Sequence, residues 1–384
     1  MRAKYVALVV ALSLIVLSTA GCGGGGGAPE QKKQPIRIGI TAPITGRGAD
    51  YGAYLVSSAK MAVEEINAKG GIDGRLIELF IEDDQSDPSV SVNATKKFIH
   101  ETKVDMILSS AVSLCTLAQI PVCEQAGMPL FCTVASSPAI TKENHPWLVG
   151  QMAVPDDAAL VAGATYAVRD MGLKKAAILY ENSDYGRGPG LAAAEQVKAL
   201  GGQVVALETV NPTDTDFMVV LSKMKAANPD VMIVMAMPTA APMIVRQKKQ
   251  IGLDVPLFVN QGNCSSVFIE QAKEFAEGVY STGFWSPFAT DERSVKFVEA
   301  YTKFAGRPPV QACAGTYDGV YLIAEAVKKL GGFDKAKVRD FIRNTKEFVG
   351  VAGQYSFNEN GRNSMPMSVT RVQGGKWVVV DKVK

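Results

Sequence analysis

Three aspartates are the residues whose type and spacing come nearest to a reactive site. Asp83, Asp84 and Asp87 stand close together in the chain, and grouped carboxylate oxygens could bind a divalent cation. The group follows an apolar run and directly precedes Pro88, a residue that is common at the first position of a helix. We therefore interpret these carboxylates as loop-solvating and helix-capping groups, and we expect no metal site there.

Motifs of catalysis are missing from the chain. We find no P-loop, no G-x-S-x-G and no H-E-x-x-H. The run GRGPG at 186–190 has the wrong spacing for a dinucleotide fingerprint, and Pro189 lacks the amide that a phosphate would use. The two histidines, His100 and His145, stand on a charged helical face and beside a proline, which favours solvated side chains over metal ligands. We therefore expect neither an enzyme nor a cofactor.

Cys22 is the cysteine whose surroundings indicate a modification. It follows an apolar run at 5–17 and four small residues, and it precedes five glycines. With Arg2 and Lys4 in front, this pattern resembles a bacterial lipoprotein signal, although Thr19 stands where leucine is usual. The apolar run is too short for a permanent membrane span. We expect Cys22 to be lipidated, and the alternative is an ordinary secretory signal with a chance cysteine.

This signal predicts where the protein works. Residues 1–21 would be removed, residues 22–35 would form a flexible Gly-rich tether, and the folded part would sit outside the cytoplasm, in a periplasm or on the outer face of the cell membrane. Removing Arg2 and Lys4 lowers the formal charge from +2 to zero. A neutral protein has no electrostatic basis for binding nucleic acid.

The other five cysteines do not form a recognisable framework. They show neither a C-x-x-C pair nor zinc spacing, and their odd number leaves at least one thiol free. Cys115 and Cys123 are eight residues apart on a predicted helix, which places them roughly 12 Å apart at about 1.5 Å per residue. A disulfide-dependent scaffold is therefore not expected.

The rest of the chain alternates between apolar strands and amphipathic helices in two successive arrays. Runs that are apolar throughout, such as 231–235, are typical of strands buried on both faces of a parallel sheet. Two such arrays predict an α/β fold of two doubly wound lobes. We predict strands at 36–42, 76–81, 104–108, 129–134, 175–180, 203–209, 231–235 and 257–259, and helices at 52–68, 88–101, 114–126, 157–171, 188–200, 217–226, 242–251 and 320–329.

A short internal echo links the two arrays. Asp-Tyr-Gly occurs at 50–52 and again at 184–186, each time after a strand and before a helix. Ligands of open α/β sheets bind at the carboxyl ends of the strands. We therefore expect Tyr51 and Tyr185 on opposing lips of one cleft, with lobe core as the alternative for each.

Several stretches together resemble the leucine/isoleucine/valine-type substrate-binding proteins of ABC transporters. The resemblance covers nearly all of the chain from Ile36. NAKGGI after a helix, with an acidic loop shortly downstream, is its most specific part. The stretches are IGITAP at 38–43, NAKGGI at 67–72, EDDQSDP at 82–88, YGRG at 185–188, FAEGV at 275–279 and GTYD at 315–318.

The resemblance implies a type I periplasmic binding protein: two doubly wound parallel-sheet lobes, joined by a three-segment hinge, that close around a ligand. The crossings would lie near 151–152, 284–285 and 361–365. Lobe I would then comprise 36–152 and 286–362, and lobe II would comprise 153–285 and 363–384.

The resemblance also implies which residues bind the ligand. Ser113, Val134 and Ser136 match positions that grip an α-carboxylate with hydroxyls and with amides at a helix start. Ser113 could instead be a plain N-cap of the helix that follows it. Tyr51 and Tyr185 match aromatic residues that line the cleft.

Gln261 departs from the family. Leucine-type proteins have a glutamate there, which pairs with the ligand's ammonium, whereas Gln261 supplies a carbonyl oxygen without charge. Either another acid compensates, with Asp184, Glu181 and Asp318 as candidates, or the ligand has no ammonium. The alternative for Asp318 is that it caps or stabilises the helix 320–329, and the alternative for Asp184 is that it only shapes its turn.

The side-chain end of the pocket differs too. Met237 stands where the family has tyrosine, and Ala312 stands where it has phenylalanine. Both changes would widen or soften the pocket, because methionine adapts to irregular shapes. An aromatic amino acid, a carboxylic acid without an amine or an amide becomes a plausible ligand.

The sequence thus predicts a lipid-anchored solute receptor. It would capture a small carboxylate ligand, namely a branched-chain or other hydrophobic amino acid, by hinge closure and deliver it to the permease subunits of an ABC importer. The alternatives are the same role for an aromatic or branched carboxylic acid or an amide, and a ligand sensor module. Permease and ATPase genes beside this one would distinguish transport from sensing.

Overall fold

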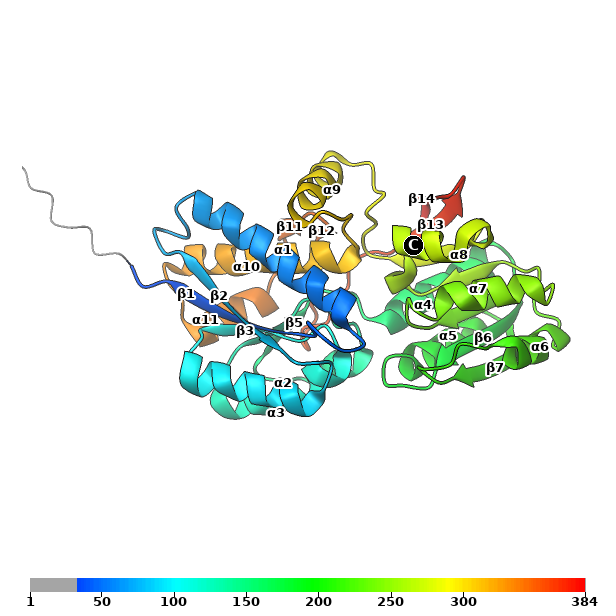
Figure 1. Ribbon diagram of the computed structural model, residues 1–384, viewed down its shortest axis with the longest axis horizontal. Helices are drawn as coiled ribbons and strands as arrows, with labels where there is room; N and C mark the ends of the chain where they lie inside the picture. The colour runs from blue at the N-terminus through cyan, green and yellow to red at the C-terminus, as the bar shows by residue number, and fades with distance from the viewer. Residues whose placement is uncertain (1–32, 384) are drawn as a thin grey trace, which may run out of the picture. The chain divides into compact units, whose positions relative to one another are not determined.

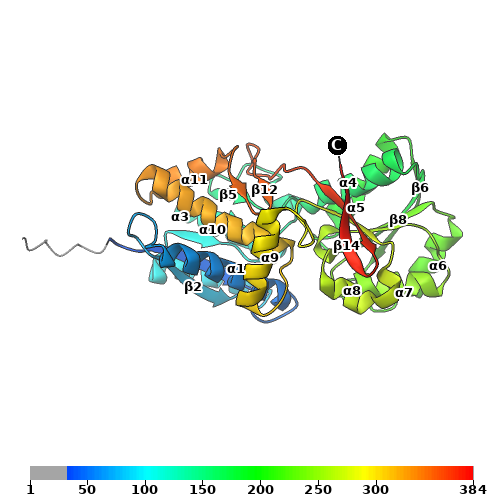
Figure 2. The same ribbon diagram turned by 90° about the horizontal axis from the view of Figure 1, so that it is seen from above.

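The computed structural model describes residues 33–383. The predicted signal at 1–21, Cys22 and nearly all of the predicted tether lie outside the described residues, so they stay predictions. The segment Gln34–Lys384 forms one compact unit. Within it, Figures 1 and 2 show two α/β lobes, each built on its own sheet.

The first lobe is built on a five-stranded sheet in the order β2-β1-β3-β4-β5, and every neighbouring pair is parallel. In β1 the side chains of Ile36, Ile38 and Ile40 are almost fully buried. The strands are β1 (Ile36–Ala42), β2 (Ile77–Asp83), β3 (Met106–Leu108), β4 (Leu130–Cys132) and β5 (Leu148–Gln151).

The second lobe is built on a seven-stranded sheet in the order β14-β13-β10-β9-β8-β6-β7. Strands β6 to β10 pair in parallel, and the hairpin β13–β14 adds two antiparallel strands at one edge. The strands are β6 (Lys175–Glu181), β7 (Gln203–Val210), β8 (Val231–Met235), β9 (Leu257–Val259), β10 (Tyr280–Gly283), β13 (Ser368–Gln373) and β14 (Lys376–Lys382).

Helices cover the sheets of both lobes (Figure 1). Those of the first lobe are α1 (Ala49–Ala68), α2 (Pro88–Lys97), α3 (Ser113–Ala126), α9 (Glu292–Ala305), α10 (Gln311–Leu330) and α11 (Lys335–Arg343). Those of the second are α4 (Asp156–Thr165), α5 (Arg187–Ala199), α6 (Met218–Ala226), α7 (Ala241–Gln250) and α8 (Ser266–Ala272). A small hairpin, β11 (Val349–Gly350) and β12 (Gly353–Gln354), follows α11.

Two predicted helices end earlier than expected as α-helices. The helix predicted at 88–101 is α-helical to Lys97 and continues as one π-helical turn, Phe98–Thr102. The helix predicted at 157–171 likewise passes into a π-helical turn, Tyr166–Asp170. The ring of Phe98 gives a physical reason for the first case, because it is fully buried and packs directly against Gly39 of β1. Tertiary packing of this kind leaves no mark on helical periodicity.

The chain passes three times between the two sheets. It leaves the first sheet after β5 and enters α4 of the second lobe, and it returns after β10 to α9, which packs on α1. After β12 it crosses again to β13 in the second sheet. This connectivity divides each lobe between distant parts of the sequence.

All five cysteines among the described residues are free and buried. Burial raises the pKa of the Cys115, Cys123 and Cys132 thiols to about 12. Four of the five cysteines, all except Cys115, belong to the hydrophobic clusters that form the cores of the lobes, so these four act as small apolar groups.

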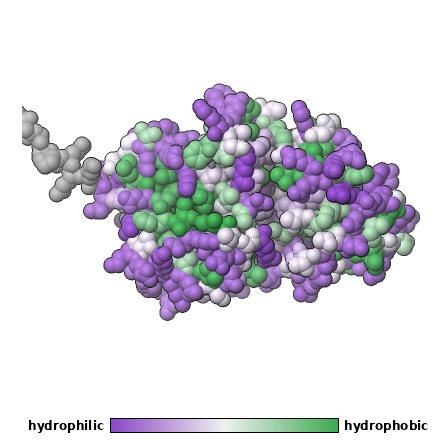
Figure 3. Space-filling model, viewed as in Figure 1, coloured by the Kyte–Doolittle hydropathy of each residue, from purple (hydrophilic) through white to green (hydrophobic). Residues whose placement is uncertain are grey.

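The face in Figure 3 is mostly hydrophilic at the rims of both lobes, with a hydrophobic area on the first lobe over α1 and β2. Strand β2 is an edge strand, and most of its side chains are only partly buried. Within residues 33–383, no helix combines the length and the apolar composition needed to cross a membrane.

Candidate functional site

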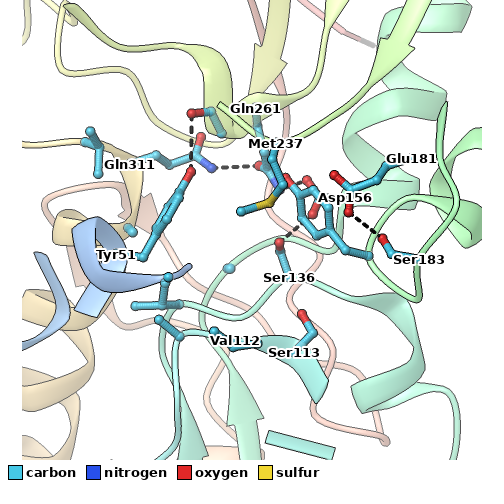
Figure 4. A pocket seen from close by; sticks show the side chains of 18 of the residues that line it. Tyr51, Val112, Ser113, Ser136, Asp156, Glu181, Ser183, Met237, Gln261 and Gln311 are labelled. Atoms are coloured by element: carbon cyan, nitrogen blue, oxygen red, sulfur yellow. Dashed lines mark hydrogen bonds between the residues drawn. The ribbon is translucent and has the colours of Figure 1, made fainter. Parts of the chain in front are cut away.

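One pocket lies where strands of both sheets end. Val134, Glu181, Met237 and Gln261 line it, and they stand at or just beyond the carboxyl ends of β4, β6, β8 and β9. Ligands of open α/β sheets bind at such ends. All seven residues predicted to contact a ligand line this pocket, and ten of its residues are labelled in Figure 4. Their contact with a ligand stays a prediction.

The first lobe presents a helix start and hydroxyl groups to the pocket. Ser113 is the first residue of α3, and the N-cap is Val112, which makes no side-chain capping bond. The alternative prediction that Ser113 is a plain N-cap is therefore wrong. Its Oγ instead accepts a hydrogen bond from Ser137 N at 3.3 Å. The first N–H groups of a helix lack intrahelical partners, so this end of α3 can donate to an anion.

The two tyrosines of the echo meet near one glycine. Tyr51 donates from its hydroxyl to Gly262 O at 3.3 Å, and Tyr185 accepts from Asn260 Nδ2 at 2.7 Å. Tyr51 belongs to α1 and Gly262 to the second lobe, so this bond crosses the cleft. Burial, followed by the nearby Asp156 carboxyl, raises the pKa of both tyrosines, which therefore stay protonated.

The echo itself has a steric cause. A Cβ on Gly52 would lie 2.1 Å from Pro43 O, and a Cβ on Gly186 would lie 2.2 Å from Glu181 O. Each helix starts so close to the strand before it that only glycine fits. The tyrosine before each glycine is thereby directed into the pocket.

Gln261 is held by bonds to both lobes. Its Nε2 donates to Val154 O at 2.7 Å and to Asp156 Oδ1 at 3.0 Å. Its Oε1 accepts from Gln311 Nε2 at 2.7 Å. Both amide protons are used, and the side chain is 4% exposed. A glutamate here could not make the two donated bonds, and it would stand beside the Asp156 carboxyl.

Asp156 is a pocket residue that was not predicted from the sequence. It is 1% exposed, begins α4 and accepts from Ser136 Oγ and from Gln261 Nε2. Burial raises its pKa to about 7, against the lowering effect of these two bonds. Asp156 therefore joins Ser136 of the first lobe to Gln261 of the second.

Gln311 was missed because its helix starts earlier than predicted. The helix predicted from 320 begins at Gln311 as α10, and this residue is 8% exposed. Its Oε1 lies 3.4 Å from Trp285 N, at a crossing between the sheets. Gly315 and Gly319 within the segment weakened the helical signal. For Asp156 the sequence did contain a signal, because the acidic pair Asp156-Asp157 directly follows an apolar stretch that ends in a proline.

Three acids were candidates to compensate for Gln261, and the structure separates them. Glu181 and Asp184 line the pocket, whereas Asp318 does not. Asp318 is buried inside α10, so it is no helix cap. Its carboxylate accepts from Val351 N, Ala352 N and Tyr355 Oη at 2.7–3.0 Å, and burial raises its pKa to about 6. Asp318 fixes the β11–β12 hairpin and is no longer a candidate for the ligand.

Glu181 and Asp184 differ in their surroundings. Glu181 is 2% exposed, and its Oε1 accepts from Ser183 Oγ at 2.7 Å. Its Oε2 is buried and has no hydrogen-bond partner among the described residues. Asp184 is exposed to solvent. Figure 4 shows Glu181 near Asp156 and Ser183 on the second-lobe side of the pocket.

Much of the remaining wall is apolar, although the charged Arg47 also lines the pocket. Met237 and Ala312, which depart from the family in addition to Gln261, both line the pocket, and Phe284, Val112 and Val310 contribute further carbon surface. Such a wall fits a hydrophobic side chain rather than a charged one.

Two of the three aspartates at 83–87 act as the sequence indicated, whereas Asp84 does not solvate the loop, because it is fully buried and its Oδ1 accepts from Ser86 N. Asp87 is the N-cap of α2 and accepts from Ser89 N and Val90 N. Asp83 accepts from Thr45 Oγ1 at 2.7 Å and from backbone amides nearby. Across residues 33–383, no group of three or more His, Cys, Asp and Glu side chains is placed to hold a metal ion.

Comparison with known proteins gives consistent matches over most of the chain. A family model described as periplasmic binding protein matches residues 35–376. The leucine-, isoleucine-, valine-, threonine- and alanine-binding protein of Pseudomonas aeruginosa is 27% identical over 326 residues, which is 85% of this chain and 86% of that protein.

Two solved structures are similar at the level of the whole fold. One is the branched-chain amino acid transporter substrate-binding protein of Streptococcus pneumoniae in complex with isoleucine, at 29% identity and a TM-score of 0.82, over 91% of this chain and 99% of that one. The other is a leucine-binding protein of Thermotoga maritima, at 26% identity and a TM-score of 0.82, with the same coverage.

Proposed function

The chain belongs to the periplasmic binding protein family, and from this we propose that it is the extracytoplasmic solute-binding protein of an ABC importer. It captures a small carboxylate ligand, namely a branched-chain or other hydrophobic amino acid, and delivers it to permease subunits. It binds this ligand without transforming it. A relative named for binding leucine, isoleucine, valine, threonine and alanine supports the ligand class, and so does a solved branched-chain amino acid binding protein in complex with isoleucine.

The observation that carries this proposal is the pocket between the two sheets. Its first-lobe side presents the start of α3 with Ser113 and, nearby, Ser136, which suit a carboxylate. Its walls near Met237 and Ala312 suit an apolar side chain. Tyr51, Val134, Tyr185 and Gln261 complete the proposed contacts.

Hinge closure supplies the signal to the permease in this proposal. We place lobe I at 36–152 with 286–362 and lobe II at 153–285 with 363–384. Bonds such as Tyr51 to Gly262 and Gln311 to Gln261 would break when the lobes separate. A permease that contacts the surfaces of both lobes would then recognise the closed form.

Ligand binding can be tested on the full chain purified in detergent. The protein is unfolded in guanidinium, washed and refolded, so that any retained ligand is removed. Its unfolding is then followed by tryptophan fluorescence with leucine, isoleucine, valine, phenylalanine and their deaminated acids. A ligand at 100 times its Kd adds about 2.7 kcal/mol, which gives a visible rise in Tm. No rise with any of these compounds would contradict the proposal, and consumption of a bound compound would show an enzyme.

A second candidate ligand class follows from Gln261. Because this side chain has no charge, an aromatic or branched carboxylic acid without an amine, or an amide, is the alternative ligand. A sensor module with the same fold is the alternative role, and permease and ATPase genes beside this one would argue against it.

The membrane anchor is a separate proposal, which rests on the lipoprotein-like pattern around Cys22. Lipid on Cys22 would hold the protein at the membrane surface. Cys22→Ser should release the protein into the soluble fraction of the cell. Continued sedimentation of this variant with membranes would contradict the lipid anchor.

A further inference from the structure

One buried carboxylate oxygen in the pocket stands out because it has no partner. Glu181 Oε2 is buried without a hydrogen bond among residues 33–383, although Glu181 Oε1 is held by Ser183 at 2.7 Å. The residue is 2% exposed and lines the pocket. Leaving a buried charged oxygen unsatisfied is costly, so the arrangement suits a group that supplies a cation or a donor.

The other acids near the pocket are already occupied or solvated. Each carboxyl oxygen of Asp156 accepts a hydrogen bond, one from Ser136 and one from Gln261. Asp184 is exposed, so water solvates its charge and weakens any pairing. Asp318 lies outside the pocket. Glu181 is therefore the acid best placed to pair with a buried cation.

Gln261 cannot take this role without losing its own bonds. Its Nε2 donates to Val154 and Asp156, and its Oε1 accepts from Gln311. These bonds make Gln261 part of the pocket wall that joins α4 to α10. The position occupied by the family's glutamate is thus structural in this chain.

We propose that Glu181 is the counter-ion for a ligand ammonium and that the ligand is accordingly an α-amino acid with an apolar side chain, rather than a carboxylic acid or amide that lacks an amine. This inference rests on the proposed function and narrows its ligand class. The carboxylate lies toward Ser113 and the start of α3, and the ammonium lies toward Glu181 Oε2. Met237 and Ala312 then face the side chain.

The polarity of the pocket supports this orientation. The first lobe contributes hydroxyl and amide donors, whereas the end of β6 contributes a carboxylate acceptor. A ligand with opposite charges on one carbon can satisfy both sides at once. An acid without an amine would leave Glu181 Oε2 without a partner inside a closed pocket.

The test compares matched ligand pairs against matched variants of the full chain. Calorimetry measures Kd for leucine and 4-methylpentanoate, and for phenylalanine and 3-phenylpropanoate, with wild type, Glu181→Gln and Glu208→Gln. Glu208 is the control because it lies on the adjacent strand β7, outside the pocket. We expect Glu181→Gln to weaken the amino acid about 10- to 100-fold, the range for a lost charged hydrogen bond, and to leave the deaminated acid unweakened. Glu208→Gln should change neither.

The outcomes separate this inference from the function on which it rests. Unchanged amino acid affinity in Glu181→Gln overturns the role of Glu181 and leaves solute binding intact. Binding of deaminated acids in preference to amino acids also overturns it. No binding by any of the four compounds, with Glu181→Gln and wild type both folded, overturns the proposed function and this inference together.

Discussion

The two sides of the pocket differ in the groups they present. The first-lobe side has the uncapped start of α3 and the hydroxyls of Ser113 and Ser136. The second-lobe side has carboxyls and amides from Glu181, Asp156 and Gln261. One side can donate and the other can accept, although both are built from the same strand–turn–helix unit. In the proposed function the unit fixes where a ligand lies, whereas a few side chains fix which of its charged ends faces each lobe.

The largest effect is expected from substitutions that disrupt the shared strand–turn–helix unit on either side of the pocket. Gly52→Ala and Gly186→Ala each place a Cβ about 2 Å from a backbone oxygen, so each should lower the free energy of unfolding by about 1–3 kcal/mol. Both should abolish binding, because Tyr51 or Glu181 moves with the displaced turn. Chemical denaturation measures the loss. Gly332→Ala is the control, since its Cβ would meet only the tip of Arg75 at 3.9 Å.

The donor side is tested by Ser113→Ala and Ser136→Ala. Each should weaken binding by roughly 1–3 kcal/mol: Ser113→Ala because a ligand carboxylate loses a hydrogen bond, and Ser136→Ala because Asp156 loses the hydroxyl that holds it at the pocket. In contrast to Glu181→Gln, the loss should be equal for an amino acid and for its deaminated analogue. Calorimetry with both ligands measures this. Unchanged affinity in both variants would remove these serines from the site.

The acceptor side should also show a pH dependence through Asp156. Its pKa rises from 3.8 to about 7 on folding, so the folded chain holds a proton that the unfolded chain has lost. The contribution to stability is therefore present at low pH and is lost as the pH rises from about 4 to 7, with a slope of at most about 1.4 kcal/mol per pH unit. Asp318, with a pKa of about 6, acts in the same direction.

Two variants separate the contributions of these two carboxyls to the pH dependence of the unfolding free energy. Asp156→Asn should flatten the fall in unfolding free energy between pH 6 and 7, whereas Asp318→Asn should flatten only the part below pH 6. Denaturation curves across this range measure both. A profile that Asp156→Asn leaves unaltered would mean that this carboxyl is already ionised at pH 6.

The smallest effect is expected from the apolar wall. Met237→Leu conserves volume, and such substitutions cost less than about 1.5 kcal/mol. The change in affinity should be the same for an amino acid and for its deaminated acid, because Met237 lies away from both charged ends in the proposed orientation. An effect on the amino acid alone would show that the ligand lies the other way round.

Most of the fold could be predicted from the sequence, because apolar runs and helical periodicity are local. The strands at 231–235 and 257–259 were predicted with the bounds that the structure has. The start of α10 was not predicted, since glycines lie where the helix packs against Thr133 and Met152. Such packing depends on residues far away in the sequence.

The residues of the pocket were predicted less completely than the helices and strands. The family resemblance predicted seven ligand contacts, and all seven of these residues line the pocket. Asp156 and Gln311 could not be found in this way, since their importance comes from bonds to Gln261, more than 49 residues away in each case. The exclusion of Asp318 likewise depends on its bonds to a hairpin more than 30 residues downstream.

The buried thiols have a practical consequence. Because burial raises the pKa of the Cys115, Cys123 and Cys132 thiols to about 12, these residues carry very little thiolate at neutral pH, and the folded chain also shields them from reagents. An alkylating reagent should therefore modify them only in molecules that have opened. The rate of alkylation therefore reports how often the first lobe unfolds locally, and a ligand that stabilises the folded protein should lower this rate.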